Sequence, residues 1–369
     1  MSEFDTNLDA KTVSTMEETD KKCPSCFGVM DFDPETGGLS CPYCGHTEII
    51  PASRQEAAAA AELPLEGADK LENFDWGMET KTVLCKACGA ESMYDALEIA
   101  AVCPFCGSNQ VMEASDQNTM APGGIVPFLV TDEKASQLFK TWIKKKWFCP
   151  KLAKESARAK HFKGIYLPYW TFDADTSSTY KGEFGRDKVR KGMNGQDKVD
   201  TTWYPVKGHY DEFFDDELIC ASANHNLYML QGLEPYRTAE NKIYKPEYLA
   251  GFAAERYSLG VENAWELTRD SIRFKIKKNI ENEIRYMHRA DRVKDLEIDT
   301  MFRDITYKYL LLPVWISSYK YKDRIYQFMV NGQTGKVAGR IPISKPKVII
   351  AITAVFILMA LILLIFRLL

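Results

Sequence analysis

The sequence predicts an α+β protein that carries small cysteine-bearing modules and one apolar helix near the end of the chain. Two groups of four cysteines share the same spacing, and residues 348–366 contain no charged side chain. Between them, apolar residues at helical spacing are interspersed with stretches rich in aromatic and β-branched residues. Helices and strands mixed in this way favour a mostly antiparallel α+β domain.

The apolar segment 348–366 predicts a transmembrane helix. Only Thr353 is polar among its nineteen residues. At about 1.5 Å per residue, a helix of this length spans about 28 Å, close to the hydrocarbon thickness of a bilayer. A buried core helix is the alternative, but core helices rarely exclude polar residues from every face. We therefore expect a tail-anchored, single-pass protein in the cell membrane.

The charges beside this segment predict its orientation. Arg340, Lys345 and Lys347 precede it and Arg367 follows it, so the basic excess favours a cytoplasmic N-terminal side. Residues 1–20 are polar and acidic and lack the apolar core of a signal peptide. We expect the bulk of the chain to be cytoplasmic.

The pairing of the cysteines predicts that the protein binds metal ions. The chain has 369 residues, 46% of them hydrophobic, and a net charge of −4, so no general basic field indicates nucleic-acid binding. Eight of the ten cysteines form four CxxC pairs, whereas Cys149 and Cys220 stand alone. Closely paired thiols in a chain without a secretion signal favour metal ligation over disulfides.

The four pairs form an internal repeat in which fourteen residues separate the two pairs of each module, and the second module begins 62 residues after the first. Two CxxC turns brought together by a hairpin can hold one tetrahedral ion. The predicted ligands of two structural Zn²⁺ ions are Cys23, Cys26, Cys41 and Cys44 in the first ribbon, and Cys85, Cys88, Cys103 and Cys106 in the second.

Glycine follows three of the four pairs, at Gly45, Gly89 and Gly107, where a positive φ is expected. The first pair departs from this, because Phe27 precedes Gly28. A thioredoxin-like redox pair is the alternative for a single CxxC, but it does not explain two copies of the four-cysteine spacing. Iron is the alternative metal for such ligands.

The predicted organisation follows from these landmarks. In chain order we expect a disordered acidic tail (1–20), zinc ribbon 1 (21–50), a helical spacer (51–80), zinc ribbon 2 (81–112), an α+β domain (121–343) and the transmembrane helix (348–366). A flexible linker is the alternative for the spacer.

Within the α+β domain, residues 125–130 are expected to form a strand, and residues 135–147 a helix with Trp142 and Trp147 in the core. The lysine-rich stretch 144–163 is interpreted as a solvated face, with attraction to anionic lipid headgroups as the alternative.

Later segments are expected to alternate between strands and a helix. Two LPxW segments, at 167–170 and 312–315, introduce β-rich sequence and suggest two related strand-forming units. We expect an antiparallel excursion over 176–225, helix over 246–290, and strands over 304–338 with a hairpin turn at Asn331-Gly332.

No catalytic motif was found, so we expect a protein that is not an enzyme. The glycines of 332–337 are too close together for a phosphate-binding Walker A loop. The acidic run 215–217 is interpreted as a solvated turn, with a metal site as the alternative. The five histidines show no ligand or triad pattern.

The paired ribbons, the LPYW and LPVW segments, the stretch VNGQTGKVAGRIP and the apolar end together resemble a bacterial family of TFIIB-type zinc-ribbon-containing membrane proteins. Members are sometimes labelled replication-restart helicase-like, a label that the missing Walker A motif does not support here. Relatives are associated with SPFH-domain (flotillin-like) and phage-shock-type membrane-stress proteins. The resemblance therefore implies a recruiting or scaffolding role at the membrane.

Two functions follow as hypotheses. The leading one is a membrane adaptor that presents a cytoplasmic surface to an SPFH-like, membrane-associated protein partner. The alternative is a nucleic-acid-binding protein held at the membrane. The second ribbon disfavours this alternative, because Lys81 and Lys86 are set against Glu91, Asp95 and Glu98.

Overall fold

A computed structural model describes residues 22–50, 60–68, 80–86, 91–95, 103, 111–114, 120–156, 162–191, 197–222, 227–322 and 324–368. The expected acidic tail 1–20 and most of the expected spacer 51–80 lie outside the described residues. The described chain mixes helices and strands, and its sheets are mostly antiparallel, which confirms the predicted fold class at that level.

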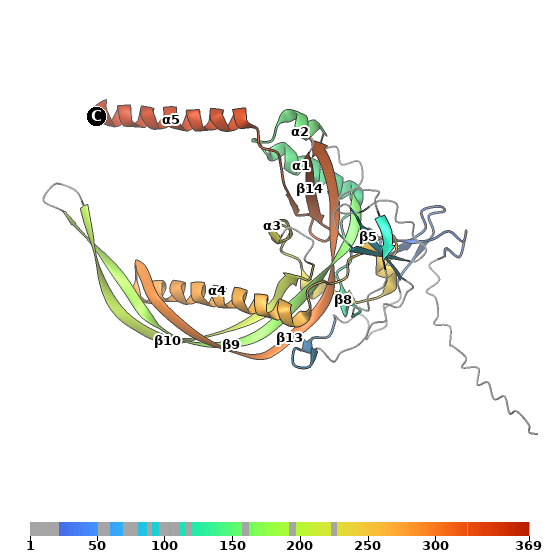
Figure 1. Cartoon of the computed structure of the whole chain (residues 1–369), viewed down its shortest axis with the longest axis horizontal. Helices are drawn as coiled ribbons and strands as arrows, with labels where there is room; N and C mark the ends of the chain where they lie inside the picture. The colour runs from blue at the N-terminus through green and yellow to red at the C-terminus, as the bar shows by residue number, and fades with distance from the viewer. Residues whose placement is uncertain are drawn as a thin grey trace, which may run out of the picture.

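Three very long strands dominate the molecule: β9 (Lys163–Lys191), β10 (Asp197–Cys220) and β13 (Arg292–Tyr321). β9 pairs antiparallel with β10 on one side and with β13 on the other. The strands leave the body of the protein as a curved arm, and helix α4 (Val261–His288) lies on the concave side of the arm (Figure 1).

Helix α4 is held to the arm by one apolar stripe. Ile272, Ile276, Ile280 and Ile284 recur every four residues and are all buried, as expected for one face of a helix. Burying each of these side chains stabilises the packing by about 1.5–3 kcal/mol. The exposed face of the same helix carries most of its charged residues, so the helix covers the sheet as a single amphipathic layer.

The two LPxW segments are direct neighbours in the sheet. Leu167 of β9 pairs with Leu312 of β13 in the antiparallel register, at the base of the arm. Each segment ends in a tryptophan whose indole N–H donates to a backbone carbonyl: Trp170 to Leu259 (2.8 Å) and Trp315 to Val130 (2.7 Å). The similar sequences therefore serve similar packing roles on adjacent strands.

Short elements complete the body around these strands. The helical ones are α1 (Asp132–Lys145), α2 (Lys151–Ser156), α3 (Leu227–Gln231), and the 3-10 turns η2 (Thr238–Glu240) and η3 (Pro246–Leu249). The strands are β4 (Leu63–Pro64), β8 (Gly124–Ile125), β11 (Lys242–Ile243), β12 (Ala253–Ala254), β14 (Arg324–Asn331) and β15 (Val337–Gly339). β12 and β8 make the parallel pairings, with β9 and β13 respectively.

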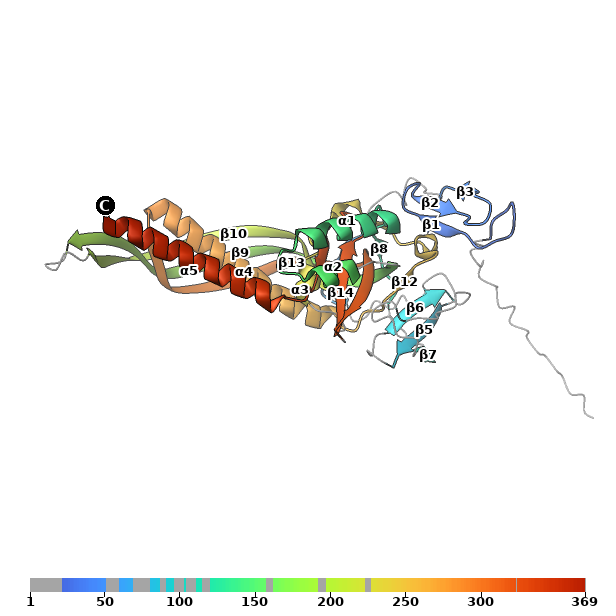
Figure 2. The ribbon, with the colours of Figure 1, turned by 90° about the horizontal axis from the view of Figure 1, so that it is seen from above.

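Two small three-stranded units lie at the end of the molecule opposite the tip of the arm (Figure 2). The first contains β1 (Asp31–Asp33), β2 (Gly38–Ser40) and β3 (Thr47–Glu48), paired antiparallel in that order. In the second, β5 (Thr80–Cys85) pairs with both β6 (Glu91–Asp95) and β7 (Val111–Ala114). β6 also pairs with β12, which joins the second unit to the main sheet.

Several local expectations are corrected. Of the expected strand 125–130, only Ile125 belongs to a strand, β8 (Gly124–Ile125). α1 ends at Lys145, so Trp147 falls in the following turn and is exposed, whereas Trp142 packs partly buried against the core. The expected helix over 246–290 divides into η3 and α4, which are separated by β12 and the preceding turn.

The turn between β14 and β15 also differs from the expected two-residue hairpin. It is closed by the Asn331 N–H, which donates to the Lys336 carbonyl (2.8 Å), and Gly335 takes the positive φ of 75°. The buried Asn331 side chain accepts hydrogen bonds from the N–H groups of Gln333 and Thr334, so the amide organises a longer turn than the sequence pattern predicted.

Helix α5 (Lys345–Leu368) contains the predicted apolar segment. Residues Lys345–Leu363 form a helix that is long and apolar enough to cross a membrane, with a mean hydropathy of 2.6 and none of that window buried within the protein. This finding is consistent with single-pass anchoring. The base of α5 lies beside α1 and α2 in both views (Figures 1 and 2).

Candidate metal centre and adjoining cavity

The first four-cysteine group is assembled as predicted. The Sγ atoms of its four cysteines, Cys23, Cys26, Cys41 and Cys44, all lie within 4.8 Å of one another. The Cys23–Cys44 and Cys26–Cys41 Sγ pairs are each 3.5 Å apart. In a tetrahedral Zn–thiolate site with bonds of about 2.3 Å, sulfur atoms are about 3.8 Å apart. The donor set and its compactness therefore fit a four-coordinate metal ion.

Each CxxC pair is part of a tight turn. The Phe27 N–H donates to the Cys23 carbonyl (2.8 Å) in the first turn, and the Gly45 N–H donates to the Cys41 carbonyl (2.9 Å) in the second. Both residues after the pairs have positive φ, 59° for Phe27 and 75° for Gly45. The two turns thus share a positive φ after the second cysteine, and in the first turn this conformation is adopted by Phe27, which is not a glycine.

The backbone of the two turns favours negatively charged sulfur, whereas the neighbouring thiols oppose it at Cys26 and Cys44. Burial opposes ionisation of Cys41, but backbone N–H groups of Cys44 and Tyr43 outweigh it and lower the pKa of the Cys41 thiol to about 7. The backbone of His46 favours ionisation of Cys44, but the neighbouring thiols at Cys23 and Cys26 raise its pKa to about 12. Four thiolates this close together require a cation to offset their repulsion.

The second four-cysteine group is only partly described. Cys85, at the end of β5, and Cys103 are buried, as two ligands of a ribbon would be. Cys88 and Cys106 lie outside the described residues, so a second metal site stays a prediction.

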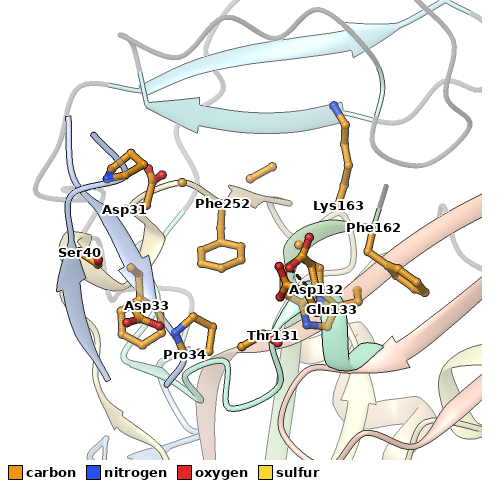
Figure 3. Close-up of a pocket in the computed structure, with 16 residues that line it drawn as sticks. Asp31, Asp33, Pro34, Ser40, Thr131, Asp132, Glu133, Phe162, Lys163 and Phe252 are labelled. Atoms are coloured by element: carbon orange, nitrogen blue, oxygen red, sulfur yellow. Dashed lines mark hydrogen bonds between the residues drawn. The ribbon is translucent and has the colours of Figure 1, made fainter. Parts of the chain in front are cut away.

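A cavity of about 570 Å³ lies between the first ribbon and the body (Figure 3). Ribbon 1 reaches the body through Phe32, whose ring lies 5.5 Å from that of Tyr248 and whose N–H donates to the Ala250 carbonyl (3.0 Å). The apolar part of the cavity wall includes the aromatic side chains of Phe32, Phe162, Phe252 and Trp315.

The charged lining of the cavity is mainly acidic. It comprises Asp31 and Asp33 of ribbon 1, Asp132 and Glu133 at the start of α1, and one base, Lys163. Burial raises the pKa of Asp31. The hydrogen bond between the Asp132 and Glu133 carboxyl groups raises the pKa of Asp132 and lowers that of Glu133. Such a cavity attracts positively charged groups and repels phosphates.

The acidic run 215–217 lies within strand β10 and not in a turn, although Asp215 is exposed to solvent as expected. Asp216 occupies a β-bulge in β10 with φ of 50° and forms an ion pair with Lys308 of β13, Nζ to Oδ1 2.7 Å. Glu62 and the buried Asp173 lie 3.2 and 4.0 Å from the same Nζ. Lys308, Asp173 and Asp216 therefore form a largely buried charge network at the base of the arm, with the half-exposed Glu62 beside it. Carboxylate oxygens of Asp173, Asp215 and Asp216 also lie within 4.8 Å of one another, which is compatible with the alternative of a metal site.

Sequence reasoning missed both the cavity and this network. The carboxylates of the cavity come from segments about one hundred residues apart, and no local spacing links them. Lys308 and its acidic partners lie on three different strands and a loop, within otherwise ordinary β-sequence. Only the pairing register brings them together.

Comparison with known proteins identifies a relative of this chain. A scan against protein-family models finds no match, and no solved structure matches. The uncharacterized protein YdjG of Bacillus subtilis (strain 168) is 31% identical over 339 residues, covering 89% of this chain and 91% of its own length. Similarity at this level over nearly the whole of both chains shows common descent, and the chain therefore belongs to the same protein family as YdjG.

Proposed function

We propose that the protein is a single-pass membrane adaptor whose zinc ribbons and α+β body form a cytoplasmic docking site for another protein at the membrane. The observation that carries this proposal is the acidic cavity between ribbon 1 and the body. The membrane anchor is α5, and the basic residues that precede it favour a cytoplasmic position for the rest of the chain.

The chemistry of the cavity suggests the kind of partner. The cavity combines the aromatic residues Phe252 and Trp315 with the carboxylates of Asp31, Asp33 and Glu133. This combination suits an extended peptide segment that carries a lysine or arginine beside apolar side chains. The cation would lie among the carboxylates and the apolar side chains against the rings. The resemblance to TFIIB-type zinc-ribbon membrane proteins favours a partner of the SPFH or phage-shock type.

The ribbons would contribute by holding the cavity in shape. A zinc ion with four thiolate ligands has no open coordination position, so its role is structural. Phe32 of β1 and the cavity residue Asp31 lie between the two metal-binding turns of ribbon 1, and the metal would therefore fix one wall of the cavity. We expect no catalytic step in this function.

Nucleic-acid binding is the second candidate, because zinc ribbons often bind nucleic acid. The charge of the cavity disfavours it, since four carboxylates line the space beside ribbon 1. A nucleic-acid-binding surface would need lysine or arginine side chains positioned to contact phosphates.

The test is co-purification from detergent-solubilised membranes. The variant Asp132→Asn/Glu133→Gln removes two cavity charges with little change in shape, and Glu262→Gln/Asp299→Asn removes two exposed charges from α4 and the arm. We expect the cavity variant to lose a protein partner that the wild type and the control variant retain. Equal recovery by all three, or recovery of nucleic acid that falls steeply with salt, would argue against the proposal.

A further inference from the structure

The end of α1, the turn that follows it and the start of α2 form one surface beside the base of α5, which we call the juxtamembrane surface. It consists of Lys144, Lys145, Trp147, Phe148, Lys151 and Leu152. We propose that this surface rests on the anionic headgroups of the bilayer that α5 crosses, and so holds the body in a defined orientation. The inference depends on α5 being the anchor and is independent of what binds the cavity.

Contacts at the base of α5 place this surface at the level where the chain meets the membrane. The Ser344 N–H donates to the Phe148 carbonyl (2.9 Å). Lys347 Nζ donates to the carbonyls of Trp147 (2.9 Å) and Cys149 (2.8 Å). The start of α5 is thus bound to the turn after α1.

The apolar part of the surface is exposed in the structure. Trp147 is 53% exposed, Phe148 42% and Leu152 67%, and the two aromatic rings pack edge to face at 5.0 Å. Large apolar side chains gathered on one surface indicate a contact surface. Tryptophan beside a transmembrane helix is typical of the membrane–water interface.

The charges of the juxtamembrane surface also favour contact with a lipid membrane. Five lysines and one acid, Glu155, lie between residues 144 and 156, and Lys144, Lys145 and Lys151 are exposed. The carboxylates of α1 are at its opposite end, in the cavity wall. Lysines near a membrane surface are attracted to anionic lipids, and exposed aromatic residues between them would insert at headgroup depth. A soluble anion would neutralise the charges of the lysines but would leave the apolar side chains exposed to water.

The polar surface of the arm restricts how α5 can be oriented in a bilayer. In both views α5 runs in roughly the same direction as the arm (Figures 1 and 2). The arm carries exposed ion pairs, including Lys181–Glu297 (2.8 Å) and Lys294–Glu183 (2.9 Å), which are costly to place in hydrocarbon. In a bilayer α5 must therefore turn away from the arm at its base. The flexible stem of Lys347 permits such a turn while its two hydrogen bonds persist.

The experiment uses full-length protein in phosphatidylcholine vesicles, with and without phosphatidylglycerol, and brominated acyl chains that quench nearby tryptophan fluorescence. We expect Trp147→Phe to remove a quenched component, and Trp203→Phe on the arm to leave quenching unchanged. The quenching that depends on Trp147 should be larger with phosphatidylglycerol. In the triple variant Lys144→Glu/Lys145→Glu/Lys151→Glu, this quenching should fall to the level seen in vesicles of phosphatidylcholine alone. The control variant Lys207→Glu/Lys277→Glu/Lys278→Glu carries the same change in charge elsewhere and should retain the larger quenching.

Three results would overturn the proposal. The first is quenching of Trp147 no greater than that of Trp203. The second is Trp147 quenching that is equal in the two vesicle types and unaffected by reversal of the three lysines. The third is an equal loss of quenching in both triple variants, which would assign the effect to total charge and not to this surface.

Discussion

Lys308 of β13 and Asp216 of β10 form an ion pair across β9, with Nζ and Oδ1 2.7 Å apart. Asp173 of β9 lies between them, and its carboxylate accepts a hydrogen bond from the Asp216 N–H (2.7 Å). β-bulges in β10 and β13 occur at the same level, where Asp216 and Asp304 have positive φ. The charge network therefore ties three strands together where the arm leaves the body.

Removing the cation from this network should destabilise the protein. In Lys308→Met, Glu62, Asp173 and Asp216 would face one another without a cation, at a cost of about 3–5 kcal/mol. The measurement is the free energy of unfolding in detergent micelles, followed by tryptophan fluorescence. Lys294→Met, which breaks an exposed ion pair with Glu183, should cost less than about 1 kcal/mol. Equal effects of the two variants would contradict this account.

The same variant should show a defined pH dependence. Burial already raises the pKa of Asp173 to about 6 in the wild type, and loss of Lys308 should raise it further. A carboxyl group whose pKa is higher in the folded state holds its proton more tightly there, so stability falls as pH rises through that pKa. We expect the difference between Lys308→Met and wild type to be smaller below about pH 5 than above about pH 7. A difference that grows on acidification would refute the assignment.

Each of the two four-cysteine groups should account for one bound metal ion. We expect two zinc ions per chain in protein purified without chelators, measured by elemental analysis. Cys23→Ser/Cys26→Ser and Cys85→Ser/Cys88→Ser should each lose one, because two thiolates cannot retain a tetrahedral site. Cys149→Ala, which removes a buried cysteine outside both groups, should retain two. Less than one ion in the wild type would rule out the ribbons as metal sites.

Deleting residues 346–369 should release the protein from membranes. α5 is the one helix in the described part of the chain that is long and apolar enough to cross a bilayer. The readout is the distribution between membrane pellet and supernatant after high-speed sedimentation. Sedimentation that persists at high salt would reveal another anchor, and sedimentation at low salt alone would assign residual binding to the lysines of the juxtamembrane surface.

Lys347 should hold the base of α5 to the turn after α1. Lys347→Met removes the donor to the Trp147 and Cys149 carbonyls, and we expect a loss of about 1–3 kcal/mol in local stability. Hydrogen exchange at Ser344, whose N–H is bonded to Phe148, should become faster. Lys345→Met changes an exposed neighbour and should leave this exchange rate unaltered.

The sequence predicted features that depend on local spacing. The ligands of the first metal site, the apolar segment of α5 and the amphipathic helix α1 each follow from a pattern within a few turns of chain. The lengths of β9 and β13 did not follow, because the arm alternates charged and apolar residues on two faces whose environments depend on α4 and on strand pairing.

The errors have a common physical cause. Trp147 was placed in the core because it continues the helical spacing of α1, but the helix ends at Lys145 and the next turn bonds instead to α5. Asp216 was taken as solvated because its partner Lys308 is ninety-two residues away in the chain. Both side chains are positioned by contacts across the sheet or between helices, which no window of sequence contains.

The central claim is that the cavity beside ribbon 1 binds a protein, and site-specific photo-crosslinking in cells tests it most directly. A photo-reactive residue at Glu133 lies in the cavity wall, and the same residue at its exposed neighbour Lys134 lies outside that wall. We predict a discrete protein adduct from position 133 that is weak or missing from position 134 and is lost when Asp31 is replaced by Asn. Adducts of equal strength from both positions, or adducts to nucleic acid alone, would contradict the account.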